Sequence, residues 1–117
     1  MFRHHETGRE GELLARKYLE KHGYEIITTN WRHGRLELDI VAEKQGVLHI
    51  VEVKTLSGST AGYPEEQVTH KKMDNLTRAA DAFLHQYGRS IQLQFDIVSV
   101  VLKEGDAEYL HIEDVYY

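Results

Sequence analysis

The stretch from Leu36 to Thr55, LELDIVAEKQGVLHIVEVKT, predicts the centre of the fold. Apolar and polar residues alternate on both sides of the turn-forming segment 44–46, which is typical of two β-strands joined as a hairpin. We expect the strands to pair antiparallel with Asp39 opposite Glu52, because a slip of one residue would bury Glu52 away from that partner. The same register places Leu38 opposite Val53, Ile40 opposite Val51, Val41 opposite Ile50 and Glu37 opposite Lys54.

The two-residue period of a strand sorts these side chains onto two faces of the hairpin. The first strand should carry Leu36, Leu38, Ile40 and Ala42 on one face, and Glu37, Asp39, Val41 and Glu43 on the other. The second strand should carry Leu48, Ile50, Glu52 and Lys54 on one face. This arrangement gathers three carboxylates and one lysine at one end of a partly apolar face: Glu37, Asp39, Glu52 and Lys54.

Such a group of acids predicts a divalent-cation site. Buried like charges repel each other strongly unless a cation lies between them, and carboxylate oxygens suit Mg²⁺ or Mn²⁺. Lys54 follows Glu52 on the same strand face, so it could hold a phosphate or a water without binding the metal. The alternative is a solvated hairpin with a surface Glu52–Lys54 pair, which the apolar neighbours disfavour. The E-x-K tripeptide alone occurs by chance in many proteins.

The composition is that of a single domain, residues 1–117, without disulfides. The chain has no cysteine, which is compatible with a reducing, cytoplasmic location. No apolar run reaches the ~20 residues of a membrane-spanning helix, and the N-terminus has no signal-peptide core, so we expect no membrane association. The net charge of −5 argues against a general polyanion binder. The acids of a metal site are part of that charge, which weakens the argument.

The rest of the chain predicts two helices and three more strands. Thr7-Gly8-Arg9-Glu10 has the spacing of a capping box and should begin a helix that ends at Gly23. A second helix should run from Pro64 to about Tyr87 after a loop of small residues. Strands are expected at 24–29, 91–102 and 107–112. The order α-β-β-β-α-β-β indicates an α/β fold with a mixed sheet.

Two groups of basic residues lie outside the predicted acid cluster. Segment 30–35 is expected to be a turn, and it contains the only tryptophan, Trp31. Its cations could grip a nucleic-acid backbone while Trp31 stacks on a base; equally, Trp31 could close the core while the arginines are solvated. A second basic pair lies near the start of the second helix. The four residues are Arg32, Arg35, Lys71 and Lys72.

An ordered set of short motifs runs through nearly the whole chain. It comprises Gly8…Gly11-Glu12…Ala15…Tyr18-Leu19…Gly23-Tyr24, Asn30-Trp31-Arg32, Glu37-Leu38-Asp39-Ile40-Val41-Ala42, Val51-Glu52-Val53-Lys54, Gly62-Tyr63-Pro64-Glu65-Glu66-Gln67-Val68…Lys72…Leu76…Ala80, Phe95-Asp96-Ile97-Val98 and Ile112-Glu113-Asp114. With these motifs the chain resembles a bacterial family of small uncharacterised proteins that are predicted endonucleases. That family is related to Holliday-junction resolvases within the PD-(D/E)xK, restriction-endonuclease-like superfamily.

The resemblance implies a restriction-endonuclease-like α/β fold of two or three layers and a Mg²⁺- or Mn²⁺-dependent endonuclease acting on DNA, including branched or structured DNA. It implies that Asp39 and Glu52 bind the metal and that Lys54 assists the attacking water. From the residues alone, Glu12 is simply an acid near the positive end of the helix dipole; the resemblance makes it a third metal ligand. Glu37 is expected to be a partner of Lys54.

Two positions depart from the family pattern. Leu36 replaces the glycine usual before the first acidic strand motif, and Leu56 replaces the arginine usual after the E-V-K motif. Neither is a metal ligand, so substrate affinity is more affected than catalysis. The alternative function is therefore a nuclease-fold module that binds nucleic acid or protein and cuts neither. Resolvase-like relatives work as dimers, so we expect a homodimer, for which the last strands and the Tyr116-Tyr117 tail offer surface.

Overall fold

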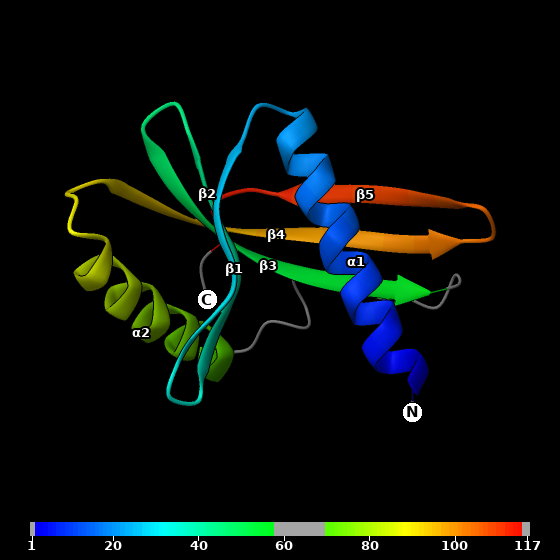
Figure 1. The fold of residues 1–117 in the computed structure, drawn as a ribbon, viewed down its shortest axis with the longest axis horizontal. Helices are drawn as coiled ribbons and strands as arrows, with labels where there is room; N and C mark the ends of the chain where they lie inside the picture. Colours follow the sequence, from blue (N-terminus) through cyan, green and yellow to red (C-terminus); the bar gives the residue numbers. More distant parts are fainter. Residues whose placement is uncertain (1, 58–69, 116–117) are drawn as a thin grey trace.

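The protein folds as two helices packed on one mixed β-sheet (Figure 1). The structure is a computed structural model, which describes the backbone of residues 2–57 and 70–115 and the side chains of 8–57 and 71–115. Within these ranges the elements are α1 (Phe2–Lys21), β1 (Glu25–His33), β2 (Leu36–Lys44), β3 (Val47–Ser57), α2 (His70–Tyr87), β4 (Gln92–Lys103) and β5 (Asp106–Ile112). The predicted α/β class with a mixed sheet is confirmed.

The sheet has the strand order β1-β2-β3-β4-β5. The β3–β4 pair is parallel and the other three pairs are antiparallel. Because parallel strands need a crossover connection, α2 and the segment before it carry the chain from the end of β3 back to the start of β4. Neither of the described helices combines the length and the apolar character needed to cross a membrane.

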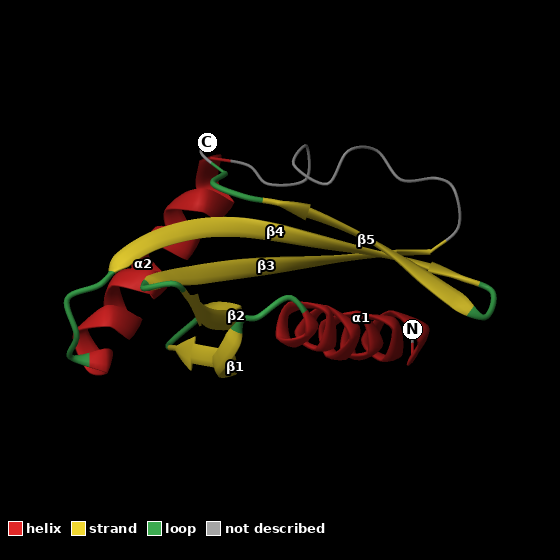
Figure 2. Ribbon diagram, turned by 90° about the horizontal axis from the view of Figure 1, so that it is seen from above, coloured by secondary structure: helices red, strands yellow, loops and turns green. Residues whose placement is uncertain are grey.

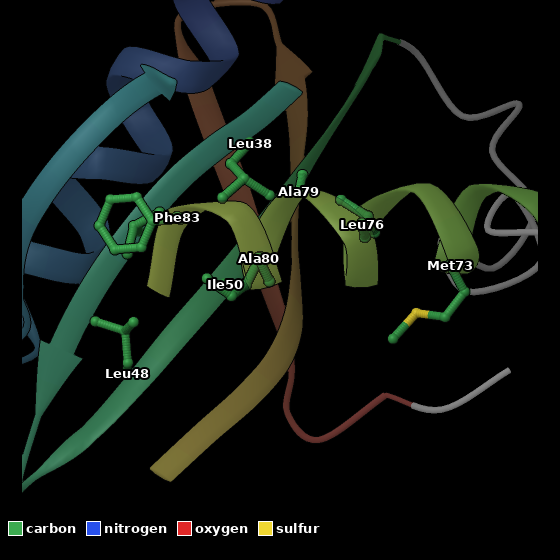
Figure 3. Close-up of a cluster of buried hydrophobic side chains, with 9 residues drawn as sticks. Leu38, Leu48, Ile50, Met73, Leu76, Ala79, Ala80 and Phe83 are labelled. Carbon is green, nitrogen blue, oxygen red and sulfur yellow. The ribbon is translucent and has the colours of Figure 1, made fainter. Parts of the chain in front are cut away.

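The two helices cover opposite faces of the sheet, which gives three layers (Figure 2). Ile50 of β3 packs in the cluster built with α2, whereas its neighbour Val51 packs in the cluster built with α1. Consecutive strand residues point to opposite faces, so the two clusters lie on either side of β3. Figure 3 shows the α2 cluster, which contains Leu38, Val41, Leu48, Ile50, Met73, Leu76, Ala79, Ala80 and Phe83.

The first helix begins earlier than predicted. Thr7 lies inside α1, so the capping box does not mark the start of the helix. The spacing of a threonine and a glutamate three residues later is also compatible with a helix interior, and no Gly or Pro in 2–6 interrupts the helix. For the second helix, the predicted start at Pro64 with its acidic first turn lies outside the described residues. The predicted end at Tyr87 is confirmed.

The predicted turn over residues 30–35 is wrong, because β1 continues to His33. Trp31 pairs with Leu38 of β2, and its ring packs edge-on against Phe83 of α2 at a centroid distance of 5.4 Å. This packing outweighs the local preference of the segment for a turn. Of the two interpretations left open, the structure places Trp31 against the core. Similarly, β3 runs to Ser57, two residues into the segment predicted as a loop.

The predicted hairpin register is confirmed at its centre and differs at its open end. Ile40 pairs with Val51 and Val41 with Ile50. Beyond Ile40 the β2–β3 ladder stops, and the Val53 backbone N–H instead donates to Asp39 Oδ2 at 2.9 Å. The predicted direct pairs of Leu38, Asp39 and Glu37 with β3 are therefore not formed.

The alternation of side chains along β2 also changes at Asp39. Leu38 packs in the α2 cluster and Ile40 in the α1 cluster, although the sequence predicts one face for both. On the neighbouring strand, Asn30 has a positive φ of 51° between Thr29, which pairs with Ile40, and Trp31. This local irregularity lets the end of β1 and the start of β2 turn toward α2, while the start of β1 and the end of β2 cover α1.

Candidate functional site

Asp39 and Glu52, the two acids predicted from the hairpin, lie together in a groove beside α2. The groove is formed by the start of β2, the middle of β3 and the described beginning of α2, and Arg35 and Lys72 also line it. Glu52 is 7% exposed. Its face of β3 is the one that packs on α2, because it shares the strand period with Ile50. The two carboxylates are thus drawn from the core-forming hairpin, on strands that the core holds in place.

Two lysine ammonium groups approach the same oxygen of Glu52. Lys72 Nζ lies 2.7 Å from Glu52 Oε2, and Lys54 Nζ lies 3.6 Å from it. The prediction that Lys72 lies outside the acid cluster is wrong, because α2 crosses this end of the sheet and directs Lys72 at Glu52. Sequence periodicity places the stem of Lys72 on the apolar stripe but does not reveal which strand residue lies beneath it. Lys71, the next residue back, is exposed.

The groove disfavours the charged forms of Asp39 and Lys54. Burial and the nearby Glu52 carboxylate raise the pKa of Asp39 to about 8, and the Val53 hydrogen bond only partly opposes this rise. The pKa of Lys54 is lowered by burial and by the neighbouring Lys72. Burial also acts to lower the pKa of Lys72, but its ion pair with Glu52 outweighs it and the net shift is upward. Asp39 therefore holds its proton to a higher pH than a free aspartate, and Lys54 loses its proton more readily than a free lysine.

Glu12 lies on α1 and takes part in the same electrostatic network. Its pKa is raised by burial and by the charges of Glu37 and Glu52, against the effect of a hydrogen bond with Asn30. Glu12 stands in the middle of α1, so the interpretation as a first-turn dipole acid is wrong. The preceding Gly11 allows this approach, because a Cβ there would overlap the side chain of Thr55 at the end of β3.

The Glu12 carboxylate lines a second groove, between α1 and the middle of the β1–β2 pair. Arg9, Arg16 and Asn30 also line this groove, as does Ile40 of β2. Asp39 is the next residue along β2 and lines the groove on the α2 side. The two grooves therefore lie on either side of the same point of β2.

The charges of the three predicted metal ligands influence one another, but their carboxylate oxygens are not all close enough to bind one ion as they stand. Among the described residues, the one group of three whose ligand atoms all lie within 4.8 Å of one another is His49, Asp96 and Glu113. Glu12, Asp39 and Glu52 do not form such a group. Their donor set, oxygen atoms alone, still suits Mg²⁺ or Mn²⁺, and the raised pKa values of Glu12 and Asp39 indicate a place where added positive charge would be favourable.

The cluster around Asp96 lies on the α1 face of the sheet and was not predicted. Asp96 Oδ2 accepts hydrogen bonds from His49 Nδ1 at 2.6 Å and from His111 Nε2 at 2.9 Å. Asp96 Oδ1 accepts from Gln94 Nε2 at 2.9 Å and from the Asp114 backbone N–H at 3.1 Å. Burial would raise the pKa of Asp96, but these hydrogen bonds outweigh it and hold the pKa below its usual range.

We interpret the Asp96 cluster as structural. Both carboxylate oxygens already accept hydrogen bonds, and the 2.6 Å contact between His49 Nδ1 and Asp96 Oδ2 has the length of a strong hydrogen bond between the two side chains. The Asp114 hydrogen bond fixes the chain after β5 to β4. The sequence signal was a single aspartate inside the apolar strand 91–102, and it could not identify the histidine partners because they lie on two other strands.

Of the remaining predicted site residues, Glu37 and Arg32 pair with each other. Arg32 Nη2 lies 3.2 Å from Glu37 Oε2 at the surface. The expectation that Glu37 is the partner of Lys54 is therefore wrong, and Lys54 contacts Glu52 instead. The cause is the β1 extension, which places Arg32 directly opposite Glu37 in the β1–β2 ladder. Arg35 lines the α2-side groove together with the acids, so the prediction that it lies outside the acid cluster is wrong.

Comparison with known proteins places these features in a family. The model of a family described as "Uncharacterised protein family UPF0102" matches residues 11–100, which include Glu12, Asp39, Glu52 and Lys54. A UPF0102 protein of Bacteroides thetaiotaomicron is 44% identical over 117 residues, covering 100% of this chain and 97% of the relative. A UPF0102 protein of Parabacteroides distasonis matches equally, and one of Flavobacterium psychrophilum is 35% identical over 117 residues, covering 100% of this chain and 98% of the relative. The chain therefore belongs to the uncharacterised protein family UPF0102.

Proposed function

We propose that this protein is a divalent-metal-dependent endonuclease with a restriction-endonuclease-like fold, which hydrolyses phosphodiester bonds of DNA, including branched or structured DNA. One observation carries the proposal. The partly buried carboxyl group of Asp39 lies beside Glu52, and its pKa is raised to about 8. A protein that needed this position only for stability would favour an apolar residue there. A divalent cation shared by the two acids gives a reason for the arrangement.

The roles follow from the positions of the side chains. Asp39 and Glu52 would hold Mg²⁺ or Mn²⁺, with Glu12 approaching from α1. When bound, the cation would lower the pKa of a water molecule and stabilise negative charge on the phosphate. Lys54 would orient the attacking water and take up its proton, which its lowered pKa favours. Lys72 would position Glu52 through their 2.7 Å contact.

The second candidate is a nuclease-fold module that binds nucleic acid or protein without cutting. One observation favours it: Glu52 already has two ammonium partners, so lysines alone supply positive charge at this acid. Leu36 and Leu56 also remove features usual in the family pattern. The expected homodimer remains a prediction: Leu110 of the edge strand β5 is 49% exposed, and the Tyr116-Tyr117 tail lies outside the described residues.

Cleavage of a panel of DNA substrates separates the two candidates. The panel holds duplex, single-stranded, flapped and four-way DNA, each incubated with Mg²⁺ or Mn²⁺. We expect the wild type to cut at least one substrate, and Lys54→Met, which keeps the stem and removes the charge, to abolish cutting. Mn²⁺ binding measured by calorimetry should persist in this variant, because Lys54 is not a ligand. Lys17→Met, at an exposed position of α1, is the matched control and should cut normally.

The result that contradicts the nuclease proposal is equally definite. If the wild type binds DNA tightly but cuts no substrate with either metal, and Lys54→Met binds in the same way, the protein is a binding module.

A further inference from the structure

We propose that Arg9 and Arg16 form a phosphate-binding ridge on α1 that guides a DNA strand into the carboxylate site from the Glu12 side. The inference rests on the proposed function, which it deepens by assigning the surface that holds the substrate. Neither arginine was among the nucleic-acid contacts predicted from the sequence. Both line the groove that also contains Glu12 and Asn30.

The spacing of the two arginines suits a nucleic-acid backbone. They are seven residues apart on α1, which is two helical turns and about 10.5 Å along the axis. At this separation the two side chains can each contact a different phosphate of the same strand. Guanidinium groups bind phosphate oxygens in a two-pronged geometry that a lysine cannot form. Leu13 lies between the arginines and is 50% exposed, so the groove also offers an apolar contact for a sugar.

The charges of Arg9 and Arg16 are more available than those of two of the four predicted contacts. Arg32 is paired with Glu37, and Lys72 is paired with Glu52. Within the part of the chain that the structure describes, no carboxylate pairs with Arg9. Arg16 approaches Glu20 only at 3.9 Å, with both side chains about half exposed, and such a pair contributes little.

The groove that contains Glu12 lies next to Asp39 and Glu52, so a strand bound in it would reach these acids. Ile40 lines the groove on the α1 side, and Asp39, the adjacent residue of β2, lines the groove on the α2 side. A backbone held by Arg9 and Arg16 would therefore run past Glu12 to the first half of β2 and the middle of β3, where Asp39 and Glu52 lie. A repeating phosphate chain fits this path better than an acidic peptide, whose charges have no fixed spacing.

Two double variants with the same loss of charge test the proposal. Arg9→Gln/Arg16→Gln removes the ridge, and Lys17→Gln/Lys21→Gln removes two exposed cations of the same helix that line neither groove. Binding of fluorescent duplex and four-way DNA is measured without divalent metal across a series of salt concentrations. We expect the ridge variant to bind about tenfold more weakly and its log–log salt slope to be shallower by about two, as for two lost phosphate contacts. The control should stay close to wild type, and circular dichroism should show the same helix content in all three proteins.

Equal weakening in the two double variants would overturn the proposal, since only net charge would then matter. Unchanged binding in the ridge variant would overturn it as well. A wild type that binds DNA but cuts none contradicts the nuclease activity and leaves this binding comparison intact. A wild type that binds no DNA contradicts both.

Discussion

Two aspartates on opposite faces of the same sheet, Asp96 buried and Asp39 half-buried, have opposite electrostatic properties. Asp96 accepts hydrogen bonds from two histidines, one glutamine and one backbone N–H, and its pKa lies below the usual range. Asp39 accepts one backbone hydrogen bond beside another carboxylate, and its pKa is raised to about 8. The surroundings of Asp96 stabilise its charge, and those of Asp39 destabilise it. A buried acid of the second kind is the stronger candidate for function, because its cost to folding needs another explanation.

The same substitution in the two clusters should have opposite effects on stability, and the larger effect is expected at Asp96. Asp96→Asn should lower the free energy of unfolding by about 3 kcal/mol, because an amide cannot accept all the hydrogen bonds that the carboxylate accepts. Urea denaturation at pH 7 measures this change. A depressed pKa contributes stability above the ordinary pKa of 3.8 that is lost as the pH falls through the folded-state value, so the gap between wild type and variant should narrow in acid. A variant as stable as wild type at pH 7 would show that the Asp96 cluster is not structural.

Asp39→Asn should stabilise the metal-free protein. The amide oxygen can still accept the Val53 hydrogen bond, while the repulsion with Glu52 is removed. A raised pKa means that stability is lost as the pH rises from 3.8 through about 8, so the advantage of the variant should grow over that interval. We expect a gain of about 1–2 kcal/mol at pH 8, measured by urea denaturation in a chelator. A loss of stability at pH 8 would remove the contrast between the two aspartates.

The smallest effect is expected at the exposed pair of Arg32 and Glu37. Arg32→Gln should change the free energy of unfolding by no more than about 0.5 kcal/mol, because surface ion pairs are screened by solvent. Urea denaturation measures this change on the same scale as for the two aspartate variants, and thermal denaturation measures it as a shift in Tm. A loss of several degrees in Tm would mean that the ladder between Arg32 and Glu37 supports the turn of β2 toward α2.

The sequence predicts the hairpin, the two helices and the two acids of the groove, because each of these depends on the local period of apolar residues and on local charge. The central pairs of Ile40 and Val41 with β3 follow from hydrophobic alternation alone. The Asp96 cluster could not be predicted, since its members meet only when β3, β4 and β5 pair. The position of Lys72 also depends on how α2 crosses the sheet. The irregularity at Asn30 and Asp39, which redirects the start of β2, leaves no mark in the alternation of polar and apolar residues.

The parallel pairing of β3 with β4 has a consequence for the order in which the molecule assembles. The β2–β3 hairpin closes across the two residues Gln45 and Gly46, a loop that can form within about 1–10 μs. The β3–β4 ladder must wait for the whole crossover through α2, and such non-local contacts slow folding. Asp39 and Glu52 therefore come close early, and Lys72 arrives only when α2 docks. Until then the two acids oppose collapse of the α2 face, so a divalent cation present during refolding should accelerate that late step.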